Sequence, residues 1–396
     1  MSDLRTNPYR LFFPIALFGI LTGLSLMLVP LNAYALIWHR EWMIGLFLLP
    51  IVIGFLFTAG PRFYASFPVT WFELILAFLS LLGMIATAAA GNELGFVISR
   101  FVAILVLLAF LLVRIAKRTS GFPIFSPFIL GSLALGIFGS VAHLLLALQA
   151  QTGLQIDFIA PDRLVQLRSS CYYVGMFQVL IYGVGTRFFP MMTIVARPGG
   201  TAYGKLIGSS KTLWFGVALV FVLTFVAEGL GFVSGALWTR AVVVTFIGVE
   251  GWLVFRKFEA SGVYPVFVRL VLITAIVAQV LYPFFPGQRV HLYHATFVGI
   301  FGMGVLMVVG HVVIAHERLD LSMRNTSRIF AIAFGLLYLG LLTRATAQIT
   351  KSYTFHLQMA AACALLGVLL FSGKLLLELI RKSRSGSPGP TQSTPQ

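Results

Sequence analysis

Charged residues are scarce in this chain of 396 residues, at 10% of positions, whereas hydrophobic residues make up 59%. The mean hydropathy of +0.96 is too high for a soluble globular domain. Acidic residues are especially few, so the formal net charge is +16. In a soluble chain this surplus would suggest a nucleic-acid partner, but here the basic residues fall between apolar runs and act as orientation signals. We therefore predict no nucleic-acid binding and an all-α polytopic protein whose partner is the lipid bilayer.

Cysteines and catalytic motifs are also missing. Cys171 and Cys363 lie in apolar runs without CxxC, CxxCH or zinc-ligand spacing, which disfavours a disulfide framework and covalently attached haem. The chain contains no Walker, GxGxxG, GxSxG or HExxH motif, and no polar stretch is long enough for an extramembrane domain. An enzyme of the soluble type is therefore not expected.

Apolar runs separated by charged residues, Pro, Gly or Asn predict about twelve transmembrane helices. These cover residues 11–30, 42–60, 69–90, 95–115, 125–150, 165–189, 209–230, 234–255, 264–284, 291–316, 327–347 and 354–380. Residues 1–382 then form a single transmembrane domain. Residues 383–396 have no apolar content to bury and are expected to be a disordered cytoplasmic tail.

The distribution of basic residues predicts the orientation. An even number of spans puts both termini on one side, and that side then holds 20 of the 28 lysines and arginines. Because basic residues are enriched on the cytoplasmic side, we expect both termini in the cytoplasm.

This arrangement predicts the histidines at two levels of the membrane. At ~1.5 Å per residue, the stretch from His294 to His316 spans about 33 Å, close to the ~30 Å core of a bilayer. These two residues therefore cannot share a metal ion. Five of the seven histidines are expected near the outer face, and two at the cytoplasmic end of span 291–316: His39, His143, His291, His294 and His356 in the first group, His311 and His316 in the second.

Neutral imidazole is the usual nitrogen ligand of haem iron and copper, and haem b needs only one or two histidines from facing helices. His39 and His294, at the same depth on two spans, are the leading axial-ligand candidates. His291 lies one turn before His294 and could bind a second site or copper, and His143 is the most interior of the outer group. The alternative is that histidines at helix starts simply hydrogen-bond to loops. As possible metal ligands we select His39, His291, His294 and His316.

Other polar residues in the spans allow two interpretations. Haem propionates need cations, which Arg289 and Arg344 could supply on the outer side, although snorkelling would explain both arginines equally well. The acids Glu73, Glu228 and Glu250 are expected to pair with nearby basic residues.

A repeated motif suggests internal symmetry. Gly60-Pro-Arg62-Phe63 and Gly185-Thr-Arg187-Phe188 each end a span at the cytoplasmic side, and His311 has a comparable position in span 291–316. The intervals from Arg62 to Arg187 and from Arg187 to His311 are 125 and 124 residues. They predict three repeats of four helices, unless arginine simply ends helices at this interface. Gly19-xxx-Gly23 should allow close helix packing.

Three motifs resemble the NnrS family in the family's order. They are Trp38-His39-Arg40-Glu41-Trp42-Met43-Ile44-Gly45, Gly185-Thr-Arg187-Phe-Phe-Pro190-Met-Met-Thr193, and His294-Ala-Thr-Phe-Val298-Gly299-Ile-Phe-Gly302 followed by His316. The resemblance implies a haem- and copper-containing membrane protein of the bacterial response to nitric oxide. Two positions depart from the family pattern: Glu41 replaces a second histidine, and His311 replaces an arginine.

The expected twelve spans and threefold repeat also look like the catalytic subunit of haem-copper oxidases, a likeness of fold alone. No histidine lies in spans 165–189 or 209–230, so the binuclear centre of those enzymes cannot form, and reduction of oxygen or nitric oxide is not expected. Our first hypothesis is a haem-binding protein of the NnrS type in a bacterial inner membrane, which senses, buffers or protects against nitric oxide. The alternatives are a secondary transporter or metal-handling permease that uses the outer histidines, and a quinol-linked redox enzyme.

Overall fold

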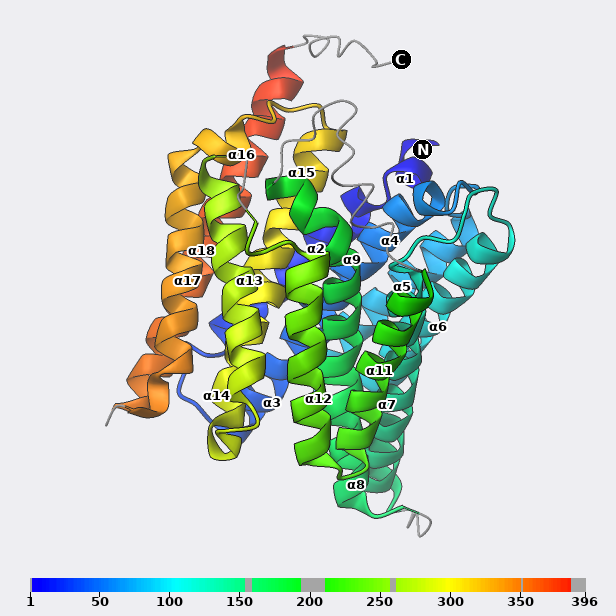
Figure 1. Ribbon diagram of the computed structural model, residues 1–396, viewed down its shortest axis with the longest axis vertical. Helices are drawn as coiled ribbons and strands as arrows, with labels where there is room; N and C mark the ends of the chain where they lie inside the picture. Colours follow the sequence, from blue (N-terminus) through cyan, green and yellow to red (C-terminus); the bar gives the residue numbers. More distant parts are fainter. Residues whose placement is uncertain (1, 154–158, 194–210, 257–260, 350–351, 386–396) are drawn as a thin grey trace.

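The computed structural model describes residues 2–153, 159–193, 211–256, 261–349 and 352–385 (Figure 1). Within these ranges every regular element is a helix, and no strand is present. The prediction of an all-α polytopic membrane protein is thus confirmed.

Ten helices of the described part are long and apolar enough to cross a bilayer. Two further helices are not among the ten: α2 (Tyr9–Ser25), which is shorter, and the long run from Pro161 to Thr193. The count of twelve transmembrane helices therefore stays a prediction. The short helices are α1 (Ser2–Thr6) and α16 (Met323–Thr326). The ten spans are Ala33–Phe63, α5 (Trp71–Ala89), α6 (Glu93–Ala116), α7 (Ser126–Thr152), α11 (Lys211–Gly229), α12 with η3 (Val233–Phe246 and Ile247–Gly251), α13 (Val263–Leu281), Pro286–His316, α17 (Arg328–Ala345) and α18 (Tyr353–Ser385).

Three composite helices each contain a π-helical segment followed by an α-helix. The π segments begin at Trp42, Arg168 and Ala295, which are 126 and 127 residues apart. This spacing is close to that of the G-x-R-F motifs and favours the threefold repeat, which stays a prediction. The composite helices are α3, η1 and α4 (Ala33–Glu41, Trp42–Leu48, Leu49–Phe63); α8, η2 and α9 (Pro161–Leu167, Arg168–Met176, Phe177–Thr193); and η4, α14, η5 and α15 (Pro286–Gln288, Arg289–His294, Ala295–Gly304, Val305–His316).

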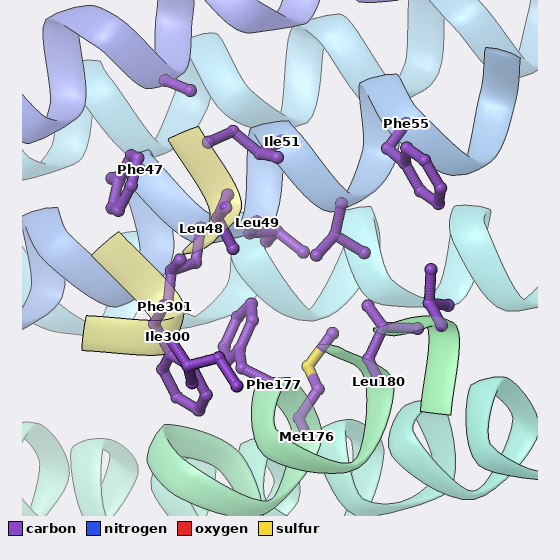
Figure 2. Packing of buried hydrophobic residues seen from close by; sticks show 14 of the residues in the cluster. Phe47, Leu48, Leu49, Ile51, Phe55, Met176, Phe177, Leu180, Ile300 and Phe301 are labelled. Atoms are coloured by element: carbon purple, nitrogen blue, oxygen red, sulfur yellow. The ribbon is translucent and has the colours of Figure 1, made fainter. Parts of the chain in front are cut away.

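The composite helices form the centre of the bundle. The apolar part of the first is 89% buried and that of the third 72%, against 33–50% for the other eight spans. Figure 2 shows α4, α9 and η5 meeting through apolar side chains, and the ring of Phe177 lies 6.4 Å from that of Phe301. The middle of the core is therefore largely apolar, and most of its buried ion pairs lie nearer the helix ends.

Gly19 lets α2 pack directly on the first composite helix. A Cβ atom at this position would lie 2.0 Å from the carbonyl oxygen of Leu46. The close approach expected from Gly19-xxx-Gly23 is thus present, and it involves backbone rather than a flexible side chain.

The two ends of the bundle differ in the elements they carry. The helix α1 and the last turns of α18 lie at one end, which we call the terminal end, whereas α3 and α14 lie at the other (Figure 1). Because α3 and α14 contain His39 and His294, we call that the histidine end. The helix α18 continues to Ser385, three residues into the expected tail, and residues 386–396 lie outside the described residues.

Candidate functional site

His39 and His294 make the same kind of hydrogen bond. Nδ1 of His39 donates to the carbonyl oxygen of Gly23 in α2 at 2.7 Å, and Nδ1 of His294 donates to that of Val290 at 2.7 Å. Because a carbonyl oxygen only accepts, the proton of each neutral ring is assigned to Nδ1, and the lone pair to Nε2. Neither Nε2 atom has a hydrogen-bond partner among the described residues, and both rings are half-buried.

Arg344 of α17 brings positive charge to these histidines. Its guanidinium lies within Coulombic range of His39, His291 and His294, and His39 lies within that range of His294. Nη1 of Arg344 donates to Nδ1 of His291 at 2.7 Å, so the proton of neutral His291 is on Nε2. Arg344 is only 9% exposed and has no carboxylate partner in the described part of the chain.

His143 belongs to a different cluster at the same end. Its Nδ1 accepts from Nη2 of Arg100 at 2.8 Å, and its Nε2 lies 2.9 Å from a carboxylate oxygen of Glu93. Nη1 of Arg100 also donates to Glu41 at 3.1 Å, and the hydroxyl of Tyr173 donates to the same carboxylate. Both ring nitrogens of His143 are therefore occupied, which leaves no lone pair for a metal in this arrangement.

Arg289 has a carboxylate partner, unlike Arg344. It forms an ion pair with Glu228 of α11, which also pairs with the fully buried Arg240 of α12. The hydroxyl of Tyr293 donates to Glu228 at 3.1 Å and accepts from Nε of Arg289 at 3.0 Å. The charge of Arg289 is thus compensated by protein, and Arg344 is the better-placed cation for an anionic ligand beside His39 and His294.

The expected pairing of the span acids holds for two of them. Glu228 pairs as described, and Glu73 pairs with the buried Arg114. Glu250 is exposed and forms no ion pair among the described residues, so its pairing stays a prediction.

The residues that the sequence predicts at the cytoplasmic side form separate contacts at the terminal end. Nη1 of Arg62 donates to Nε2 of His316 at 2.7 Å, while Nδ1 of His316 donates to the carbonyl of Val312 at 3.0 Å. His311 accepts from Arg324. Arg187 lies over the ring of Phe63. His316 therefore has no free lone pair, and none of these residues joins His39 and His294.

The donor atoms at the histidine end fit a haem better than a small metal ion. No group of three His, Cys, Asp or Glu residues that could hold a metal occurs among the described residues. A haem iron needs only two axial nitrogens, and the neutral tautomers of His39 and His294 provide two. The ring of His294 packs edge-on against Phe297 at 5.9 Å, which supplies an apolar wall.

The cluster around Glu41 was not expected from the sequence. Glu41 and Arg100 are 1% and 0% exposed, yet they are 59 residues apart, so no local spacing connects them. The available signal was a carboxylate beside His39 in place of the second histidine that the family pattern carries. An acid at the start of an apolar span requires a basic partner on another helix.

Fold and site together define a multi-pass α-helical membrane protein with a buried polar layer at one end. A model of the NnrS family, described as NnrS protein, matches residues 3–383, nearly the whole chain. The chain therefore belongs to the NnrS family, and this membership supports a role in the nitric oxide response. A comparison with curated proteins finds no match.

Proposed function

We propose that this protein binds haem b at the histidine end, with His39 and His294 as axial ligands, and acts in sensing, buffering or protection against nitric oxide. The observation that carries the proposal is the matched tautomer of the two rings, because each has Nδ1–H fixed by a carbonyl and Nε2 unpartnered. A backbone carbonyl that accepts from Nδ1 commonly fixes the tautomer and the orientation of a histidine that binds a metal through Nε2. His316 also donates through Nδ1, but Arg62 occupies its Nε2.

The surrounding residues have distinct roles in this proposal. Arg344 faces the histidines without a carboxylate partner and would bind a propionate through charge-assisted hydrogen bonds. Gly23 holds the His39 ring by its carbonyl, and any Cβ there would lie 2.9 Å from Sδ of Met43. A bound haem would supply an iron, which nitric oxide could bind only in place of one of the two histidines. Copper remains a weaker proposal, since His291 donates rather than accepts at Nε2 in this arrangement.

The orientation belongs to the same proposal. The surplus of lysine and arginine on the side of the termini supports cytoplasmic termini, which puts the histidine end on the outer side of a bacterial inner membrane.

The test compares haem content in three histidine variants purified in detergent. We expect His39→Ala and His294→Ala each to lower the haem-to-protein ratio by about tenfold or more, because a lost axial ligand removes iron coordination. The matched control is His356→Ala, since His356 lies near the histidine-end start of α18 and its one described ring contact is with Phe355. The reduced-minus-oxidised visible spectrum and its change with nitric oxide provide the readout.

Full haem content in His294→Ala would contradict the assignment of His294 as an axial ligand. Wild-type protein that takes up no haem under any condition would favour the second candidate, a transporter or metal-handling permease. The lining of one cavity does not support binding of an ion, as that alternative would require. A cavity of about 60 Å³ between α2, α4, α9 and α15 has an apolar lining that includes Leu48, Leu180 and Val308, which offers no ligand to an ion.

A further inference from the structure

A polar cluster lies inside the otherwise apolar core, where α9, α13 and η5 meet. Gln178 and Tyr182 of α9, Gln279 of α13 and Thr296 of η5 are all 0% exposed. The side chains of Gln178, Gln279 and Thr296 lie within interaction range of the Tyr182 hydroxyl. Even so, the Tyr182 hydroxyl and both polar atoms of each glutamine have no well-formed hydrogen bond to any residue that the structure describes. Buried polar atoms in native proteins are nearly always satisfied, so these five atoms require a partner.

The hydrogen bonds next to the cluster define what kind of partner fits. The hydroxyl of Tyr282 donates to the carbonyl of Leu292 at 3.1 Å, so the 2.8 Å contact between Tyr282 and Thr296 uses the proton of Thr296. The oxygen of Thr296 is then left as an acceptor. The two glutamines contribute four N–H donors and two carbonyl acceptors. The partner must therefore both donate and accept.

Water meets this requirement, and ions do not. A cation would satisfy the oxygens of Gln178 and Gln279 but leave their amide hydrogens without acceptors, whereas an anion would do the reverse. Thr296 lies ten residues after Pro286, about 15 Å along the helix, so the cluster lies well inside the membrane. It also adjoins a π-helical segment, a feature that is frequent at functional sites.

The cluster continues into the ion pairs at the histidine end. The ring of Tyr282 packs edge-on against Tyr293 at 4.7 Å, and Tyr293 donates to Glu228. Arg240, which pairs with Glu228, lies within Coulombic range of Tyr182 and has an unpartnered Nη1. We propose that Gln178, Tyr182, Gln279 and Thr296 form a buried water site that extends the Glu228 network into the membrane interior.

Radiolytic hydroxyl-radical labelling of the full-length protein in detergent, read by mass spectrometry, tests the site. Radicals form from water in place, so a buried tyrosine beside bound water is modified although bulk solvent cannot reach it. We expect Tyr182 to be labelled at least several-fold faster than Tyr64. Tyr64 is the matched reference because it is equally buried, at 0% exposure, but its hydroxyl is bonded to Ser126 at 3.1 Å.

Variants then identify the residues that hold the water. Gln279→Leu and Gln178→Leu should each lower the labelling rate of Tyr182 several-fold, whereas Gln149→Leu, near the end of α7, should not change it. Equal labelling of Tyr182 and Tyr64 in the wild-type protein would overturn the proposal even if a variant failed to fold. A Tyr182 rate that changes when sodium is replaced by choline would assign the site to a cation instead.

Discussion

Buried charged residues at the histidine end are stabilised by partners on other helices. Glu41 is 1% exposed and receives bonds from Arg100, Tyr173 and Arg40, the last at 3.3 Å. Taking a carboxylate out of water costs several kcal/mol, which such bonds must offset. The same reasoning applies to Glu228 between Arg240 and Arg289. Removal of one partner should therefore cost far more than removal of an exposed charge.

Glu41→Gln removes the negative charge that Arg100 contacts. We expect it to destabilise the protein by about 3–5 kcal/mol, because Arg100 is left buried without its counter-charge. The control is Glu250→Gln, which changes an exposed acid without an ion pair among the described residues and should stay within about 0.5 kcal/mol. Thermal unfolding in detergent measures both. The double variant Glu41→Gln/Arg100→Met should recover part of the loss, and equal stability of Glu41→Gln and Glu250→Gln would contradict the assigned role.

Residue types and depth could be predicted from the sequence, but side-chain partners could not. The hydrophobic runs predicted His39 and His294 at the same depth in the membrane. This prediction is possible because the length of an apolar helix, compared with the thickness of the bilayer, fixes the depth of each residue. That Nδ1 of His39 donates to Gly23, 16 residues earlier, depends on how α2 packs. The same spacing argument grouped His143 with the haem candidates, whereas Arg100 and Glu93 occupy both of its nitrogens.

Helix boundaries could be predicted where polar residues mark the end of a helix. They could not be predicted where polar residues lie inside a helix. The apolar run suggested a helix from residue 42, but it starts at Ala33, capped by the side chain of Asn32, which accepts from the backbone N–H of Ala35 at 2.8 Å. His39, Arg40 and Glu41 lie within this helix because their polar atoms find partners there. The π segments carry no hydrophobic period that distinguishes them from α-helix, so the sequence did not indicate them.

At the scale of elements, the contact of α2 with the first composite helix depends on Gly19. Gly19→Ala should lower the yield of folded protein sharply, because its Cβ would lie 2.0 Å from the Leu46 carbonyl and the two helices would have to separate. Gly216→Ala is the matched control, since nothing lies within 4 Å of a Cβ at that helical position. Fluorescence-detected size-exclusion chromatography measures the folded fraction of each. Equal folded fractions would show that α2 can move away at little cost.

At the scale of the whole molecule, Glu317 connects segments from both ends of the chain. It follows the third composite helix, accepts from Tyr9 at 2.6 Å, and pairs with Arg10 at 2.7 Å, residues about 300 positions earlier. Lys382 of α18 also donates to its backbone carbonyl. Helix α2, the end of the third composite helix and α18 thus meet at Glu317, at the terminal end.

This arrangement predicts a pH dependence of stability. Burial raises the pKa of the Glu317 carboxyl, but the hydrogen bonds from Arg10 and Tyr9 outweigh it, so the pKa lies below its ordinary value. A carboxyl whose pKa is lowered by folding stabilises the protein fully above its unfolded pKa of about 4.3, and this contribution is lost as pH falls through the folded pKa. Because Arg10 is partly exposed, with 38% of its side chain accessible, we expect no more than about 1 kcal/mol, or a melting temperature roughly 1–3 °C above that of Glu317→Gln at pH 7. The difference should shrink below the unfolded pKa of about 4.3 and close once the pH lies below the lowered pKa of the folded Glu317 carboxyl. A gap between wild type and Glu317→Gln that stays constant from pH 7 to pH 3 would mean that packing around residue 317, rather than its charge, connects the three parts of the bundle.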